Sequence, residues 1–132
     1  MPVPEELKYS TKHEWVGGLD DLDGGAGVLT IGITQLVVDE VGEIVYLRLP
    51  DVGTRVDAGD ICGEVETSDL TVNVFAPVAG VVTEVNQGVV DEPRSVSDDP
   101  FGRGWLFRLR VEEPPSDLLD SVAYNQHTSE PS

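Results

Sequence analysis

The chain has 132 residues, of which 39% are apolar, and it carries a formal net charge of −17 from 25 acidic and 8 basic side chains. This length predicts a single domain with one modest hydrophobic core. No apolar run approaches the length that crosses a bilayer, and no basic patch could bind a nucleic-acid backbone, so we expect neither membrane insertion nor nucleic-acid binding. The acidity either serves solubility or forms a docking face for basic partner surfaces.

Residues 1–6 show no basic region followed by an apolar one. We therefore expect no signal peptide and a cytoplasmic protein, or one processed from a longer chain. The single cysteine, Cys62, rules out an intrachain disulfide. Because Cys62 lies in a strand-like stretch beside Ile61, we expect a buried and inert thiol.

The segment before residue 28 predicts one strand and one loop. Trp15 and Val16 begin the strand, and residue chemistry alone makes His13 and Glu14 a surface pair at its start. Residues 17–27 are rich in glycine and aspartate and predict a mobile acidic loop. The aspartates do not have the offsets or the closing bidentate acid of a calcium loop, so no calcium site is expected.

An apolar run and a capped helix follow this loop. Residues 28–33 read Val-Leu-Thr-Ile-Gly-Ile, which is typical of a buried strand. Thr34 is the expected N-cap of a short helix over residues 35–41, and Gly42 stands just beyond the end of that helix. We expect the next strand over residues 44–49, where Pro50 ends it.

The middle of the chain predicts an exposed hairpin. After a short strand around Val56, the sequence from Gly63 to Gly80 has two β-favouring runs on either side of a small polar step, residues 67–71. The step is expected to form a tight turn in solvent. An exposed tip on a rigid sheet is a good place to present a group to other proteins.

The last third predicts two strands separated by a long connection. The first strand covers residues 81–86 and the connection covers residues 87–104. The second strand alternates cleanly, with Leu106, Arg108 and Arg110 on one face and the two arginines in solvent. The residues of its other face are expected in the core: Trp105, Phe107, Leu109 and Val111.

A short helix over residues 115–124, with Ser116 as its N-cap, is expected to close the domain. The domain then spans residues 1–124, and residues 125–132 form a polar C-terminal tail in which His127 is disordered. His13 and His127 are far apart in sequence and share no metal-ligand spacing with another ligand. With no phosphate loop and no nucleophile elbow either, we expect a carrier or binding protein and not an enzyme.

Three motifs of this chain together resemble the H protein of the glycine cleavage system, a family of lipoyl carriers. They are His13-Glu14-Trp15, the spacing of Glu66, Ala76, Pro77 and Gly80 around the hairpin, and Asp99-Pro100-Phe101-Gly102-Arg103-Gly104-Trp105. The resemblance runs from Tyr9 to Tyr124. It implies a mostly β barrel-sandwich hybrid, a lipoyl/biotinyl-type β-sandwich of two small sheets, with a short internal helix and a C-terminal helix.

In that family a lipoyl arm carries an aminomethyl group between the P, T and L proteins, so the resemblance implies a carrier with these partners. The arm is attached to a lysine three residues after a glutamate. Counted from Glu66, that position is Asp69. The resemblance also implies that Glu14 lines the cleft in which the loaded arm folds back, close to its amine, and that Ser97 stands where the family has an asparagine.

Asp69 changes what the resemblance predicts. Lipoate is joined to an uncharged lysine amine, and a carboxylate cannot attack the activated acid to form that amide. Glu64, Glu66 and Asp69 also make the tip anionic, which disfavours burial of an apolar arm against it. We therefore expect no covalent cofactor, and a monomeric docking or regulatory paralogue that binds the glycine-cleavage partners or lipoate-attaching enzymes. The alternatives are an acidic protein-interaction module unrelated to glycine cleavage, and a normal carrier in which residue 69 has been altered.

Overall fold

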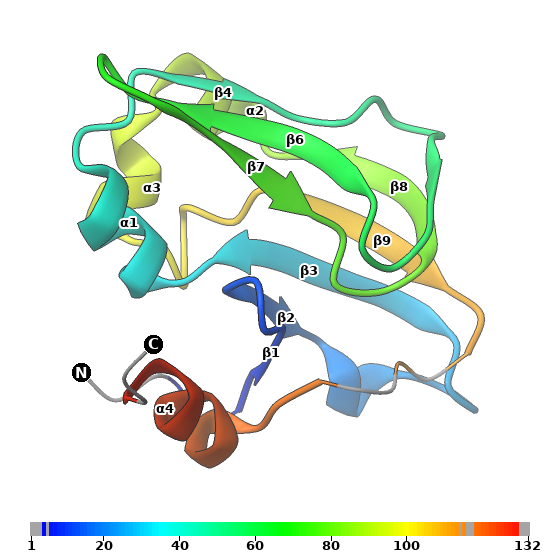
Figure 1. Cartoon of the computed structure of the whole chain (residues 1–132). Coiled ribbons are helices and arrows are strands. Elements are labelled where there is room, and N and C mark those ends of the chain that lie inside the picture. Colours follow the sequence, from blue (N-terminus) through cyan, green and yellow to red (C-terminus); the bar gives the residue numbers. More distant parts are fainter. Residues whose placement is uncertain (1–3, 5, 114, 116–117, 130–132) are drawn as a thin grey trace.

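Two antiparallel sheets, one of six strands and one of three, form the framework of the molecule (Figure 1). The computed structural model describes residues 4, 6–113, 115 and 118–129. The larger sheet has the order β1-β2-β3-β9-β8-β5 and the smaller one the order β4-β6-β7. The strands are β1 (Lys8–Tyr9), β2 (Glu14–Gly17), β3 (Gly27–Ile33), β4 (Tyr46–Arg48), β5 (Arg55–Val56), β6 (Ile61–Glu66), β7 (Thr71–Phe75), β8 (Gly80–Val85) and β9 (Phe107–Val111).

The core lies between the two sheets. Leu47 and Val65 of the smaller sheet, and Ile31, Phe107 and Leu109 of the larger one, belong to the same buried cluster. The smaller sheet buries one face and leaves the other to solvent, so its strands alternate, whereas β2 of the larger sheet is buried on both faces. The predicted mostly β barrel-sandwich hybrid is confirmed. Within the described residues, no helix is long and apolar enough to cross a membrane.

The central hairpin forms as predicted. β6 and β7 pair antiparallel, with Val65 opposite Val72 and Glu66 opposite Thr71, and the loop between them projects at one end of the smaller sheet (Figure 1). Val65 is fully buried while the loop is exposed. The register is well specified because a one-residue slip would turn Val65 to the solvent side.

The alternation predicted from Trp105 onward is only partly correct. Phe107, Leu109 and Val111 are buried as expected, but the strand begins at Phe107 and Trp105 precedes it. Trp105 is half-buried, and the guanidinium of Arg108 lies 4.1 Å from the centroid of its ring. Leu106, predicted on the opposite face, is fully buried, so the alternation and the assignment of Trp105 to the core are wrong at the start of this segment.

The internal helix α1 (Gln35–Val41) begins and ends where the sequence predicts. Gly42 follows it with a φ of 80°, a conformation that glycine adopts without strain. Thr34 occupies the N-cap position, but its hydroxyl makes no capping bond. It is bonded instead to the hydroxyl of Tyr124, at 2.7 Å.

Two helices that the sequence reading missed lie in the long connection, α2 (Gln87–Asp91) and α3 (Arg94–Asp98). The side chain of Asn86 caps α2 by accepting the N–H of Gly88 at 3.1 Å. Each helix has only five residues, which is too short for a periodic apolar pattern to reveal it. The acidic loop between β2 and β3 contains a single turn of 3-10 helix, η1 (Leu19–Asp21).

The C-terminal helix is shifted along the sequence. It is α4 (Ser121–Ser129), so the prediction of residues 115–124 is wrong, and the expected N-cap Ser116 lies outside the described residues. The carboxylate of Asp120 accepts the N–H of Ala123 at 2.8 Å and acts as the N-cap. Leu119 is extended because its backbone pairs with Tyr9 of β1. Residues 125–129, expected in a polar tail, are helical.

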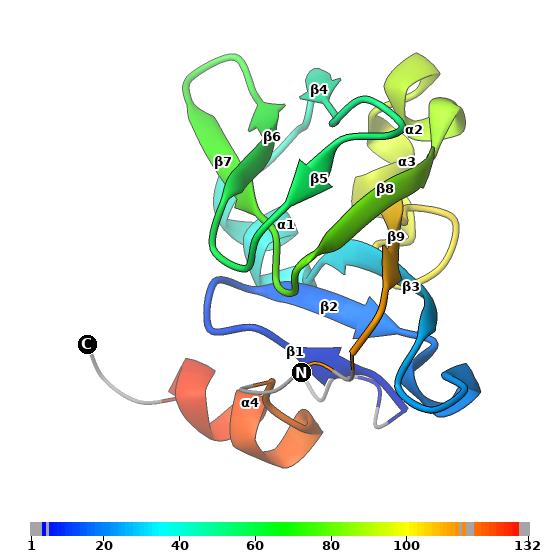
Figure 2. The same ribbon diagram turned by 90° about the vertical axis from the view of Figure 1, so that its right-hand side faces the viewer.

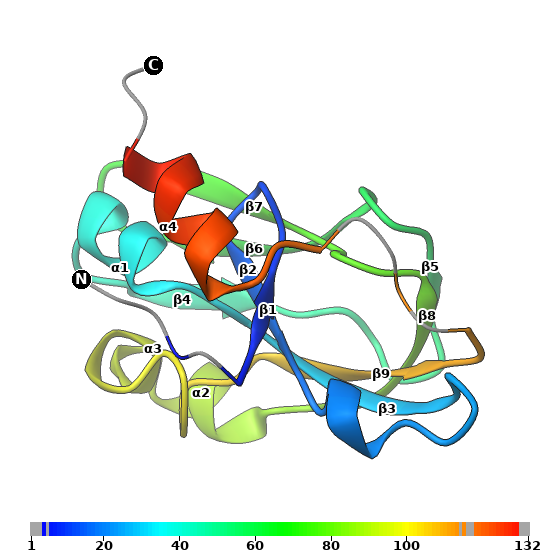
Figure 3. The same cartoon turned by 90° about the horizontal axis from the view of Figure 1, so that it is seen from below.

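Helix α4 lies beside β1, at the end of the molecule away from the smaller sheet (Figure 2). Viewed from below, it also approaches the start of α1 (Figure 3), where the Tyr124–Thr34 bond joins the two helices. Its anchor is Tyr124, which is 1% exposed. A second, smaller cluster of buried aromatic side chains forms there from Tyr9, Trp15 and Tyr124.

Candidate functional site

The tip of the β6–β7 hairpin is a four-residue turn, Thr67 to Leu70. The N–H of Thr67 donates to the carbonyl oxygen of Leu70 at 2.9 Å. The hydroxyl oxygen of Thr67 accepts the N–H groups of Asp69 and Leu70, at 3.3 and 3.2 Å. A threonine hydroxyl that bonds the backbone two and three residues onward is a local turn device that needs no contact from elsewhere in the fold.

Asp69 lies at the exposed tip of this turn. Its backbone N–H bonds Thr67, and its carboxylate has no hydrogen bond or ion pair to any residue that the structure describes. Ser68 and Leu70 on either side are exposed too, and 43% of Leu70 is accessible. Glu66 stands three residues earlier, half-buried at the end of β6, and its carbonyl oxygen accepts the N–H of Val45 at 2.8 Å.

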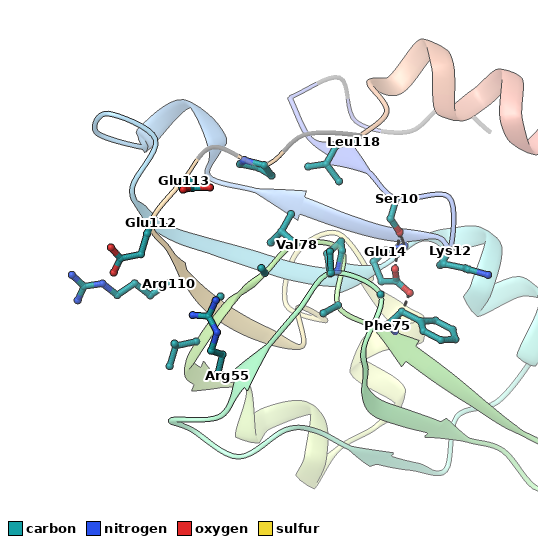
Figure 4. A pocket seen from close by; sticks show the side chains of 18 of the residues that line it. Ser10, Lys12, Glu14, Arg55, Phe75, Val78, Arg110, Glu112, Glu113 and Leu118 are labelled. Carbon is teal, nitrogen blue, oxygen red and sulfur yellow. Dashed lines mark hydrogen bonds between the residues drawn. The ribbon is translucent and has the colours of Figure 1, made fainter.

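An open cavity of about 640 Å³ lies at the end of the hairpin away from its tip, between the β1–β2 turn, β5, the end of β7, the start of β8 and the end of β9 (Figure 4). Its volume is within the range of small-molecule sites. Pro77, Val78 and Leu118 give it an apolar middle. Its two ends are polar, and they are formed by Ser10, Lys12 and Glu14 with Phe75 on one side, and by Arg55, Arg110, Glu112 and Glu113 on the other (Figure 4).

Glu14 is the buried charged group of this cavity. Only 2% of it is exposed, so the expectation of a surface pair with His13 is wrong. One carboxylate oxygen accepts the hydroxyl of Ser10 at 2.6 Å, and the other accepts the N–H of Phe75 at 3.4 Å. Residue chemistry alone could not reveal the burial, because it arises where β2 passes under the end of β7.

Burial raises the pKa of Glu14 from its ordinary value of 4.5 to about 7, although the bonds from Ser10 and Phe75 act in the opposite direction. Near neutral pH the group therefore exists in both protonation states. It can accept a hydrogen bond from an amine or donate one to an acceptor, and it can hold a proton. The bond to Phe75 also joins the cavity to β7, the strand that leaves the hairpin tip.

His13 is half-buried behind Glu14 and takes a left-handed φ of 72°. Its Nδ1 lies 2.8 Å from the hydroxyl of Tyr124. Burial is the main cause that lowers the pKa of His13, and the neighbouring His127 lowers it further. The rings of His13 and His127 have centroids 5.8 Å apart. The expectation that His127 lies in a disordered tail is therefore wrong.

Cys62 and Ser97 are two further residues that the sequence singled out. Cys62 is half-buried, and its thiol donates to the carbonyl oxygen of Val74 at 3.5 Å. Burial raises the pKa of this thiol to about 12, which agrees with the expected inert group. The hydroxyl oxygen of Ser97 is buried and finds no partner among the described residues.

Sequence reasoning found Glu14, Glu66 and Asp69 but missed Ser10, Thr34, Tyr124 and His127. Tertiary structure brings Ser10 and Glu14 together at the cavity, and it leaves Asp69 apart at the tip. The sequence offered one indication of Tyr124 and His127: the chain has only two histidines, and each stands near a tyrosine. No group of three or more metal-ligating side chains occurs in the part of the chain that the structure describes.

The two-sheet sandwich with a projecting hairpin and an adjoining cavity defines a carrier domain of the lipoyl type. The family model for the glycine cleavage H-protein matches residues 7–130, and the chain belongs to that family. The family is one of carrier proteins and not of enzymes.

Two relatives of similar length share more than two fifths of the sequence. The chain is 44% identical to the glycine cleavage system H protein of Streptomyces avermitilis over 96% of this chain and 97% of that one. It is 43% identical to the protein of the same name from Thermobifida fusca, with 97% of each chain covered. The crystal structure of a glycine cleavage system H protein from Mycobacterium marinum superposes with a TM-score of 0.88 at 33% identity, covering 97% of this chain and 100% of that one.

Proposed function

We propose that this chain is an H-protein homologue that carries no covalent lipoate and acts by docking to, or regulating, the partners of its family. One observation carries the proposal: Asp69 occupies the exposed tip of a hairpin whose two strands pair up to the turn, from Val65–Val72 to Glu66–Thr71. Lipoate attachment needs a nucleophilic amine, and a carboxylate cannot supply one. The residues at the tip therefore do not fit the cofactor that the family carries.

The local geometry supports loss of the attachment group without loss of the docking shape. Asp69 joins the turn through its backbone N–H, and its side chain contributes nothing to the turn. Any residue except proline, lysine included, can make that backbone bond. The neighbouring surface keeps the exposed side chains of Tyr46 and Leu70, at 50% and 43% accessibility, beside the tip.

The partners in this proposal are the P, T and L proteins and the lipoate-attaching enzymes. The net charge of −17 supports partners with basic surfaces, since charge complementarity speeds encounter. The proposal extends to a monomeric, cytoplasmic protein. Sedimentation and cell fractionation test those two properties.

The test is intact mass after incubation with a lipoate ligase, lipoate and ATP. We expect no added mass on the wild type and one lipoyl increment on Asp69→Lys. Ser68→Lys is the matched control: it places the same amine one residue away on the same turn, and we expect little or no modification. A lipoyl increment on the wild type would overturn the proposal, and Lys8→Arg and Lys12→Arg would then locate the site.

Docking is tested separately by competition. Excess wild-type protein should slow lipoylation of Asp69→Lys, because both present the same surface and only one can react. If neither protein is modified and the wild type does not compete with an authentic H protein, the surface has diverged. That outcome would favour an acidic interaction module unrelated to glycine cleavage.

A further inference from the structure

The turn between β1 and β2, residues Ser10 to His13, carries the end of the cavity that holds the buried Glu14, which we call the Glu14 end. Ser10 and Glu14 face each other across it: the N–H of Ser10 donates to the carbonyl oxygen of Glu14 at 2.9 Å, and the N–H of Glu14 donates to the Ser10 hydroxyl oxygen at 3.0 Å. The same hydroxyl donates to the Glu14 carboxylate. The position of this turn thus sets the position of the buried carboxylate.

The turn is held in an unfavourable backbone conformation. A φ of 72° at His13 is rare for a residue with a side chain and persists only where surrounding contacts stabilise it. Two backbone bonds contribute: the N–H of His13 donates to Ser10 at 3.2 Å, and the N–H of Thr34 donates to the carbonyl oxygen of His13 at 3.1 Å.

Helix α4 supplies further contacts to the turn from outside. The hydroxyl of Tyr124 lies 2.8 Å from Nδ1 of His13 and 2.7 Å from the hydroxyl of Thr34, so one buried group joins the turn to the start of α1. The ring of Tyr124 stacks on Tyr9 of β1 with centroids 4.7 Å apart. Since a carbonyl oxygen only accepts, Nε2 of His127 donates to Thr11 in the middle of the turn, at 3.3 Å.

We infer that α4 is the positioning element of the cavity: Tyr124 and His127 hold the Ser10–His13 turn, and the Glu14 end of the cavity keeps its shape only while α4 is docked. Neither residue lines the cavity, so both are positioning residues. The inference deepens the proposed function, because it concerns the cavity beside the family's carrier hairpin. Docking of α4 would then control the shape of the site that a ligand of the cavity meets.

Charged and titratable groups surround this contact on every side. His127 and Tyr124 approach His13 from α4, Glu40 from α1, and Lys12 from the turn itself. Protonation of His13 would add a second positive charge beside Lys12 in a half-buried position, which opposes docking of α4. Acidification below the ordinary range of histidine should therefore loosen the turn in the same way as removing the contacts of α4.

Two measurements on the full chain test the inference, and neither requires lipoate or a partner. Amide hydrogen exchange of His13, Glu14 and Thr34 reports the turn, and carboxyl ¹³C NMR reports the pKa of Glu14. Tyr124→Phe and His127→Ala should speed exchange at these amides by roughly tenfold or more. Both should lower the pKa of Glu14 from about 7 toward 4.5, since water then reaches the carboxylate.

Matched variants separate positioning from general destabilisation. Tyr46→Phe removes the same hydroxyl from a half-exposed tyrosine on the other sheet and should leave the turn unchanged. His127→Gln keeps an N–H donor at a similar reach and should restore slow exchange. Exchange at Leu109, in the core, is the reference for global opening.

The inference is overturned if Tyr124→Phe and His127→Ala leave both the exchange rates and the pKa of Glu14 as in the wild type. It is equally overturned if the Leu109 amide accelerates as much as the amides of the turn, since α4 would then stabilise the whole fold and not the cavity. Lipoylation of Asp69→Lys is a separate readout, so failure here does not decide the proposed function.

Discussion

In both the hairpin tip and the β1–β2 turn, a side-chain hydroxyl bonds the backbone of the same turn. The two turns differ in their contacts with the rest of the molecule. Each is a four-residue turn closed by a hydroxyl, from Thr67 at the tip and from Ser10 at the cavity. Among the described residues, Thr67 to Leu70 hydrogen-bond only to one another. The β1–β2 turn is bonded to segments that are distant in sequence, through Thr34, Tyr124 and His127.

This difference explains which parts of a carrier can change. A self-contained, exposed turn keeps its shape when the side chain at its tip is replaced, so the chemistry of residue 69 can be lost while the hairpin remains. A turn that several segments hold in a left-handed conformation tolerates little change. The cavity side of the molecule is therefore constrained by packing, and the tip is constrained only by function.

The largest effect is expected on the cavity side, where Glu14 should make the free energy of unfolding depend on pH. A carboxyl whose folded pKa is about 7 and whose ordinary value is 4.5 binds its proton more tightly in the folded state. Its contribution to stability is complete below pH 4.5 and is lost as the pH rises through 7, up to an amount on the order of 3 kcal/mol. Glu14→Gln removes this term.

Urea denaturation of wild type and Glu14→Gln between pH 4 and 8 measures it. We expect similar stability at pH 4 and a more stable variant at pH 8. His13, whose pKa is lowered, acts in the opposite sense and loses its contribution as the pH falls below 6.5, but it is common to both proteins and cancels in the difference. Parallel stability curves would contradict the assignment of Glu14 as the titrating group.

The next effect concerns β3, the strand that pairs with β2, which carries Glu14. A Cβ atom at Gly32 would overlap the indole ring of Trp15, which is buried and donates its ring N–H to Pro100 at 2.8 Å. Gly32→Ala should therefore destabilise the fold by about 2 kcal/mol, because a packed indole with a buried hydrogen bond cannot move aside freely. Asn73→Ala, at an exposed position of β7, is the control and should change the stability little. A neutral Gly32→Ala would mean that Trp15 is mobile.

A smaller effect on stability is expected at Thr67, whose hydroxyl closes the turn at the tip. Thr67→Ala removes the hydroxyl that accepts the N–H groups of Asp69 and Leu70, and exposed local bonds of this kind contribute about 1 kcal/mol. Thr67→Ser keeps the acceptor and should retain most of the stability. Thermal unfolding with hydrogen exchange at Leu70 measures both. Equal losses in the two variants would show that the threonine methyl group, and not the hydroxyl, matters.

The smallest effect is expected at Asp69 itself. Asp69→Ala and Asp69→Lys should leave the free energy of unfolding within about 0.5 kcal/mol of the wild type, because the side chain is exposed and makes no bond to the described residues. Urea denaturation at pH 7 checks this. A loss above about 1 kcal/mol in either variant would mean that Asp69 has a structural role. The shape of the turn would then depend on which side chain stands at residue 69.

Much of the fold follows from local patterns that the sequence displays. The hairpin, α1 and the buried strand before it were predictable because period-2 alternation, a polar turn step and a terminal glycine act over a few residues. Predictions failed where a distant partner overrides a local preference. Thr34 has the right residue type for a cap, yet its hydroxyl bonds Tyr124, and Leu119 leaves the expected helix to pair with β1.

By itself, the sequence determined the strand pattern, the exposed hairpin and the carboxylate at residue 69, since these depend on residue identity and short-range pattern, and its motifs resemble a family that has the lipoyl-type β-sandwich. Only the tertiary structure decided that Glu14 is buried, and that His13 and His127, separated by most of the chain, lie 5.8 Å apart. Burial and proximity depend on how β2, β7 and α4 pack, and no local segment contains that information.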